Sequence, residues 1–120
     1  MESEVSSLSL SNRVVLLGLA SLEAADETPV HAPAVRSACG DCTDALTDAV
    51  VGSLDEATVA RGLNVLEVEG PVVRVDDGET SAVGKGRPAF ALDAEVSEVL
   101  NALAGDEALA PAVEGVRERA

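Results

Sequence analysis

The chain has 120 residues, of which 22 are acidic and 8 basic, so its net charge is −14. This length is typical of one domain, and we treat residues 1–120 as a single domain. Apolar residues make up 47% of the chain, but there is no Trp or Tyr and only one Phe, so Val, Leu and Ala must fill the core. No apolar stretch approaches the roughly 20 residues of a membrane-spanning helix, and the acidic start is unlike a signal peptide. We therefore expect a cytoplasmic protein that does not contact a membrane.

The first predicted element is a helix that ends near Ala25, with Ser11 or Asn12 as its N-cap. Its apolar residues cover most of its circumference: Val14, Val15, Leu16, Leu17, Leu19, Ala20 and Leu22. A helix that is apolar on nearly all sides lies at the centre of a domain.

A connector with two prolines follows at residues 26–33, and a short extended piece is expected around Val30 and His31. A second helix is predicted from Pro33 to Gly52, because its apolar residues recur at steps of three and four. These are Val35, Cys39, Cys42, Leu46, and then Ala49 or Val50.

The third predicted helix begins at Leu54, because Ser53 and Glu56 have the spacing of a capping box. Gly70 is a suitable stop. The apolar stripe of this helix is Val59, Leu63 and Leu66, and its opposite face carries Thr58, Arg61, Asn64, Val65 and Glu67. Gly62 lies within the helix, where glycine costs about 1 kcal/mol relative to alanine.

A β-hairpin is predicted next, with strands at residues 72–75 and 87–92 and a turn signal at Asp77-Gly78. Phe90 is its expected core contact. Two further helices follow, one over residues 94–104 capped by Asp93 and one that begins near Pro111.

Two segments resemble archaeal and bacterial winged helix-turn-helix regulators. Residues 57–70 (ATVARGLNVLEVEG) are similar to their recognition helix, with a Thr-Val pair before a small residue and Arg, and then two Leu three apart. Residues 84–92 (GKGRPAFAL) are similar to their wing, where a basic Gly-Arg-Pro stretch leads into the closing strand. The resemblance covers about residues 14–92.

The resemblance and the order of elements imply an α+β fold, namely a mainly helical winged helix-turn-helix domain with a β-hairpin wing and additional C-terminal helices. The winged-helix core would span residues 13–92. The helices of residues 93–120, apolar on one side, are the candidate dimer interface.

The implied function is sequence-specific binding of double-stranded DNA by a homodimeric transcriptional regulator that is not an enzyme and needs no cofactor. The helix of about residues 54–69 would enter the major groove, and the wing of about residues 76–87 would contact the backbone or minor groove. The expected DNA-binding residues are Thr58, Arg61, Asn64, Val65, Lys85 and Arg87. The sequence specifies neither an operator nor a small-molecule effector.

The acidic composition resembles that of proteins from halophilic archaea, which work in concentrated salt. Near 1 M salt the Debye length is only about 3 Å, so distant carboxylates hardly repel a duplex. We therefore expect DNA binding to appear only at high potassium.

Two alternatives stay open at this stage. A winged-helix domain can serve as a protein-interaction module without binding DNA. Cys39 and Cys42, with His31, are a conceivable thiol or metal sensor. The isolated cysteine pair lies on the apolar stripe of the second helix, however, where buried Cys acts as a small hydrophobe.

Overall fold

The computed structural model describes residues 5, 7–43, 55–75, 89–107 and 109–119. This part of the chain is α+β and mainly helical, with five helices and one two-stranded antiparallel hairpin. The helices are α2 (Leu10–Ala24), α3 (Ala32–Thr43), α4 (Glu56–Glu69), α5 (Val96–Ala104) and α6 (Ala110–Arg119), and the strands are β1 (Val72–Val75) and β2 (Ala89–Leu92). None of these helices combines the length and the apolar character needed to cross a membrane. These elements confirm the predicted α+β class, mainly helical with a β-hairpin and C-terminal helices.

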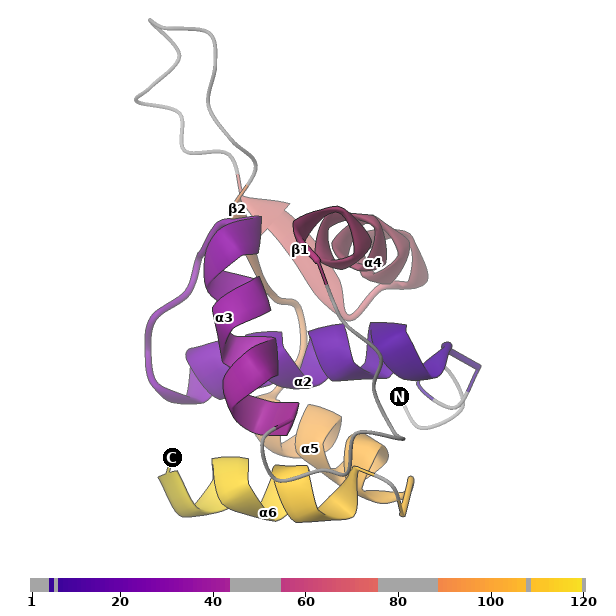
Figure 1. Ribbon diagram of the computed structural model, residues 1–120, viewed down its shortest axis with the longest axis vertical. Coiled ribbons are helices and arrows are strands. Elements are labelled where there is room, and N and C mark those ends of the chain that lie inside the picture. The colour runs from indigo at the N-terminus through magenta and orange to yellow at the C-terminus, as the bar shows by residue number, and fades with distance from the viewer. Residues whose placement is uncertain (1–4, 6, 44–54, 76–88, 108, 120) are drawn as a thin grey trace, which may run out of the picture.

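Helix α2 is the centre of the molecule, as its apolar circumference predicted. Every residue from Val14 to Ala20 is buried. Helix α4 and the hairpin lie on one side of α2, α5 and α6 lie on the opposite side, and α3 crosses it (Figure 1). The predicted N-cap is wrong by two or three residues, because the hydroxyl of Ser9 accepts the backbone N–H of Asn12 and the helix begins at Leu10.

Helix α3 crosses α2 at Gly18. A Cβ atom at Gly18 would lie 2.7 Å from Cys39 Sγ and 3.1 Å from the backbone nitrogen of Cys39. The two helices approach this closely only because residue 18 has no side chain. The predicted stripe is confirmed at Val35 and Cys39, which are buried. Its continuation from Leu46 to Gly52 lies outside the described residues.

The hairpin pairs β1 with β2 in a register that places Arg74 opposite Phe90. The first strand has the predicted bounds. Val30 and Phe90 exchange backbone hydrogen bonds of 3.0 and 2.7 Å, which confirms the extended piece expected in the connector. Phe90 is 2% exposed, so its predicted place in the core is also confirmed. The turn signal at Asp77-Gly78 falls outside the described residues.

The C-terminal helices join the same hydrophobic core as the N-terminal ones. Helix α5 packs on α2, and α6 packs on α5 and α3. The predicted Asp93 cap is wrong, because α5 begins at Val96 after Glu95, and Glu95 makes no side-chain cap hydrogen bond. The backbone N–H of Asp93 instead donates to the carbonyl of Pro71, which extends the contact between the two strands.

Candidate nucleic-acid interface

Helix α4 begins two residues later than predicted. Asp55, rather than Ser53, is its N-cap, and the Asp55 carboxylate accepts the backbone N–H of Thr58 at 2.8 Å. A capping box at Ser53 would satisfy the backbone N–H of Glu56, whereas Asp55 satisfies that of Thr58, so the capping-box spacing gave a start two residues too early. Ser53 itself lies outside the described residues.

The pKa of Asp55 is held below its ordinary value. The backbone N–H of Thr58 is the largest cause, followed by the Thr58 hydroxyl, and the nearby guanidinium groups of Arg61 and Arg36 add smaller effects. Each of these stabilises the ionised carboxylate. The start of α4 therefore lies within the electrostatic reach of two arginines from two different helices.

The inward face of α4 packs on α2 through Val59, Leu63 and Leu66, which are fully buried. Gly62 lies on the same face, and a Cβ atom there would lie 2.9 Å from Asn12 Oδ1 and 3.2 Å from Val15 Cγ2. The glycine within this helix thus permits a close approach of two helices, which explains a residue that local propensity disfavours. This packing fixes which side of α4 faces outward.

The outward face of α4 is uncovered by the described part of the chain. Arg61, Asn64 and Val65 are exposed, and Thr58 is half-buried. Val65 is 40% exposed and Val68 84% exposed. These positions agree with the predicted outward face. The sequence analysis did not include Val68 in this face. Val68 lies nine residues after the buried Val59, and that spacing places a side chain on the opposite side of a helix.

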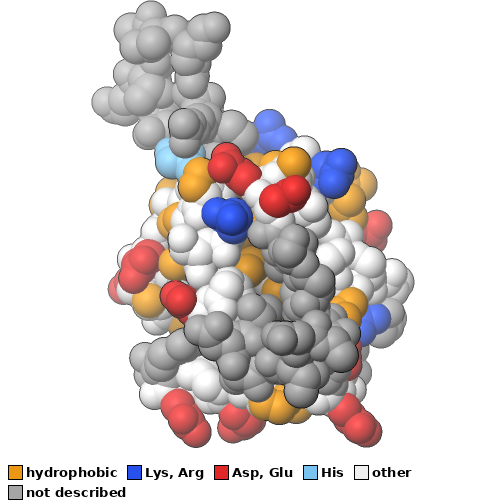
Figure 2. Space-filling view, in the orientation of Figure 1, with side chains coloured by type: hydrophobic (Ala, Val, Ile, Leu, Met, Phe, Trp, Pro, Cys, Tyr) orange, Lys and Arg blue, Asp and Glu red, His pale blue; other side chains and the backbone are white. Residues whose placement is uncertain are grey.

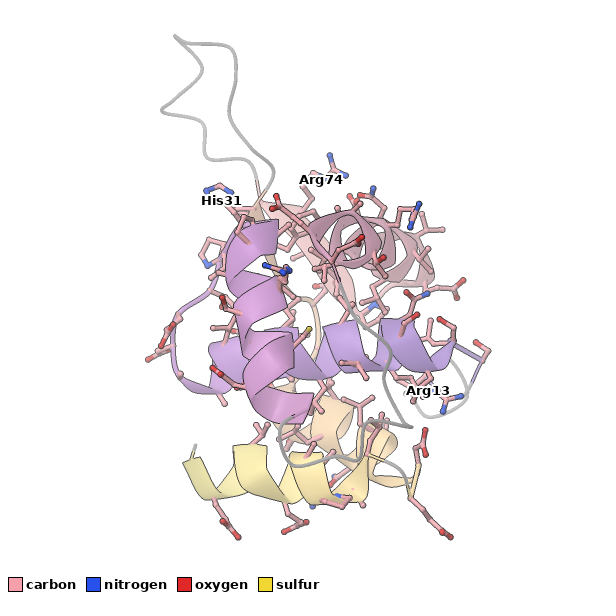
Figure 3. All side chains as sticks on the ribbon, in the orientation of Figure 1. Arg13, His31 and Arg74 are labelled. Atoms are coloured by element: carbon pink, nitrogen blue, oxygen red, sulfur yellow. The ribbon has the colours of Figure 1, made fainter. Side chains whose placement is uncertain are left out.

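Arg74 on β1 joins this surface, and sequence reasoning missed it. Its Nη2 atom donates to Asn64 Oδ1 at 2.9 Å and lies 3.2 Å from Glu67 Oε1. Its guanidinium carbon lies 5.6 Å from the centre of the Phe90 ring. Figure 3 shows Arg74 at the end of the molecule formed by α4 and the hairpin, far from Arg13 near the start of α2. Arg74 lies two residues after the buried Val72, and residues two apart in a strand share a face, which is the one sequence signal that Arg74 lies on the same side of the hairpin as Val72.

The charges of the molecule are unevenly distributed. In Figure 2, most of the visible basic side chains lie over α3, α4 and β1, with some acidic groups among them, whereas acidic side chains line the end formed by α6. The described basic residues near α4 are Arg36 on α3, Arg61 on α4 and Arg74 on β1. Lys85 and Arg87, the cations expected in the wing, lie outside the described residues.

The cysteine pair does not build a site within the described residues. Cys39 is buried in the core, and its thiol donates to the backbone carbonyl of Val14 at 3.4 Å. His31 is exposed and lies eight residues earlier, about 12 Å along a helix axis at 1.5 Å per residue. The core interpretation of Cys39 is thus confirmed, and the side chain of Cys42 lies outside the description.

The apolar faces of the C-terminal helices are covered by the chain itself. Val99 and Leu103 of α5 and Val113 and Val116 of α6 are buried in the shared core. These side chains had made the two helices the candidate dimer interface. The dimer interface stays a prediction, but it cannot use these side chains, because a stripe that fills the core of one chain is not available to a second copy.

In comparisons with known proteins, no protein-family model matches the chain, and neither a curated protein nor a solved structure matches it significantly.

Proposed function

We propose that the chain is a winged helix-turn-helix protein that binds double-stranded DNA through the outward face of α4. The order of elements supports this proposal. Helix α2, the Val30 bridge, α3, α4 and the β1–β2 hairpin follow one another as in the family that the sequence resembles. The proposed role is regulation of transcription in the cytoplasm of a salt-adapted archaeon, without catalysis or a cofactor.

The observation that carries the proposal is the free outward face of α4. A major groove admits one α-helix, and the helix must present side chains that no neighbouring element covers. Arg61 meets this requirement, because it is exposed and makes no hydrogen bond or ion pair with another described residue. Asn64 is also exposed, with its oxygen bound to Arg74. Both are side-chain types that read base edges in the major groove.

The arginines around α4 support the same surface. Arg36, Arg61 and Arg74 come from three elements and can face phosphates on either side of the groove. Lys85 and Arg87 belong to the segment that joins β1 to β2 in the chain, and we propose that they contact the backbone or minor groove. Thr58 and Val65 complete the proposed contact set.

The net charge of −14 sets the conditions under which the proposal is tested. At low salt the carboxylates repel a duplex, whereas near 1 M salt screening confines electrostatics to about 3 Å. Duplexes selected from random DNA in multimolar KCl should share a sequence, and their affinity should appear only as KCl rises. A steep loss of affinity with rising KCl would contradict the proposal.

A matched pair of variants tests the site. Arg61→Ala should lower duplex affinity about fivefold or more, because a lost base or phosphate contact costs about 1–3 kcal/mol. Arg117→Ala is the control, since Arg117 is an exposed arginine on α6 that is bound to Glu114 and Asn101. If Arg61→Ala binds as tightly as Arg117→Ala, α4 is not the reading element.

A homodimer remains part of the proposal, since two copies of α4 could then reach half-sites about one helical turn apart. Its interface would have to use side chains other than the buried apolar residues of α5 and α6. Sedimentation of the protein in molar KCl measures this directly, and a strict monomer would contradict the dimeric regulator.

The second candidate function is a winged-helix module that contacts another protein and not DNA. Its supporting observation is that the exposed large apolar residues of the described chain, Val65, Val68 and Val73, all lie on α4 and β1. Lack of duplex binding at every KCl concentration would favour this candidate over the first, whereas self-association would not, because the first candidate is itself a homodimer.

A further inference from the structure

We infer that Arg74 orients the amide of Asn64, so that α4 presents hydrogen-bond donors at both Arg61 and Asn64 and selects duplexes with neighbouring guanines. This inference rests on the proposed DNA-binding function and deepens it. Arg74 acts here as a positioning residue, because it works through Asn64.

The direction of the Asn64 amide follows from the chemistry of its partner. A guanidinium group carries only N–H donors, so the Asn64 atom that lies 2.9 Å from Arg74 Nη2 must be the amide oxygen. The amide nitrogen, with its two donors, is the end that remains for a ligand. Asn64 is exposed, so that end is accessible from outside the molecule.

Arg74 is itself held from both sides. Its ion pair with Glu67 joins it to α4, and its guanidinium lies over the ring of Phe90, which is buried and sits opposite Arg74 in the hairpin. A cation–π contact and a charged partner together restrict an arginine more than a single surface contact does. The restricted guanidinium in turn restricts the Asn64 oxygen.

The consequence is a change in what Asn64 can read. A free Asn binds adenine through two bonds, since its oxygen accepts from N6 and its nitrogen donates to N7. With the oxygen turned toward Arg74, the amide nitrogen is the end that Asn64 presents to a base, and it carries two donors. Arg61 lies three residues earlier on the same helix face and is donor-only. Guanine presents two acceptors in the major groove, N7 and O6, so adjacent guanines satisfy both side chains.

The test uses the full-length protein and the duplex selected by the wild type in molar KCl. Each guanine in turn is replaced by 7-deazaguanine, which removes the N7 acceptor. At one guanine, we expect the loss to be about tenfold in the wild type and absent in Asn64→Ala, which identifies the base that Asn64 reads. Arg74→Met should lower this guanine preference and allow adenine at the same position, and Arg74→Lys, which keeps a donor, should retain part of it.

Arg117→Met is the matched control and should keep the wild-type base preference. An unchanged preference in Arg74→Met would overturn the inference while DNA binding stands. If Arg74→Met does not fold, adenine in the wild-type consensus at the base mapped by Asn64→Ala would overturn it equally. Absence of wild-type duplex binding at every KCl concentration would refute the proposed function, and the inference would fail with it.

Discussion

Replacing Gly18 by Ala should destabilise the protein, although alanine is the better helix former. The added methyl group would lie 2.7 Å from Cys39 Sγ, 3.1 Å from the Cys39 nitrogen and 3.3 Å from the Val35 carbonyl oxygen. Two of these three atoms belong to the backbone of α3 and cannot turn away. Helix α3 must therefore move relative to α2, the element on which the rest of the core packs.

The size of the effect follows from two opposing contributions. Overpacking of a core costs about 1–3 kcal/mol, and we place Gly18→Ala near the upper end because backbone atoms are involved. The gain in helix propensity is about 1 kcal/mol. The net loss in the free energy of unfolding should be about 1–2 kcal/mol. Gly40→Ala is the control on α3, since its methyl group would meet no described atom within 4 Å.

Chemical denaturation of both variants in the same KCl concentration measures the difference. Gly18→Ala should be about 2–3 kcal/mol less stable than Gly40→Ala, which corresponds to about 10 °C in Tm. Adding Cys39→Ala to Gly18→Ala removes the nearest atom, so the two changes together should cost less than their sum. If Gly18→Ala is as stable as Gly40→Ala, the helix crossing is not as close as described.

Two further predictions concern charge. The hydrogen bond to Thr58 lowers the pKa of Asp55 in the folded chain, so the unfolded chain binds more protons in acid. The stability that this cap contributes is fully present above the ordinary pKa of 3.8 and is lost as the pH falls through the lowered pKa of the folded chain. The unfolding free energy of the wild type should therefore fall more steeply with acid than that of Asp55→Asn, which keeps the cap without the charge; equal slopes would show that the cap hydrogen bond is absent. Because of the net charge of −14, Tm should also rise from low to molar KCl, and a Tm that falls over this range would contradict self-repulsion as the dominant effect of salt.

Helix ends were the weakest part of sequence reasoning, for a physical reason. The chain offers several polar residues near each helix start, such as Ser53 and Asp55 before α4, and any of them can accept a backbone N–H. Which one does so depends on where the apolar stripe meets the core. The structure selects Asp55 for α4 and Ser9 for α2, and it leaves Asp93 without a capping role.

The candidate site was predictable only in part. The outward positions of Arg61 and Asn64 followed from helical periodicity, because Val59, Leu63 and Leu66 fix the inward side. Arg74 did not follow, because its partners belong to α4 and β2 and meet it only in the folded chain. The same limitation led to the dimer rationale, since a stripe on α5 or α6 has the same sequence pattern whether its own core or a second copy covers it.

The pattern of apolar residues by itself determined that α2 is central, that α4 has one inward face, and that residues 72–75 and Phe90 belong to a hairpin. These are local properties, set by the periods of helix and strand. The tertiary structure decided the helix crossings at Gly18 and Gly62 and the bond between Arg74 and Asn64. Those features depend on distances between elements, and packing sets such distances only when the whole core has formed.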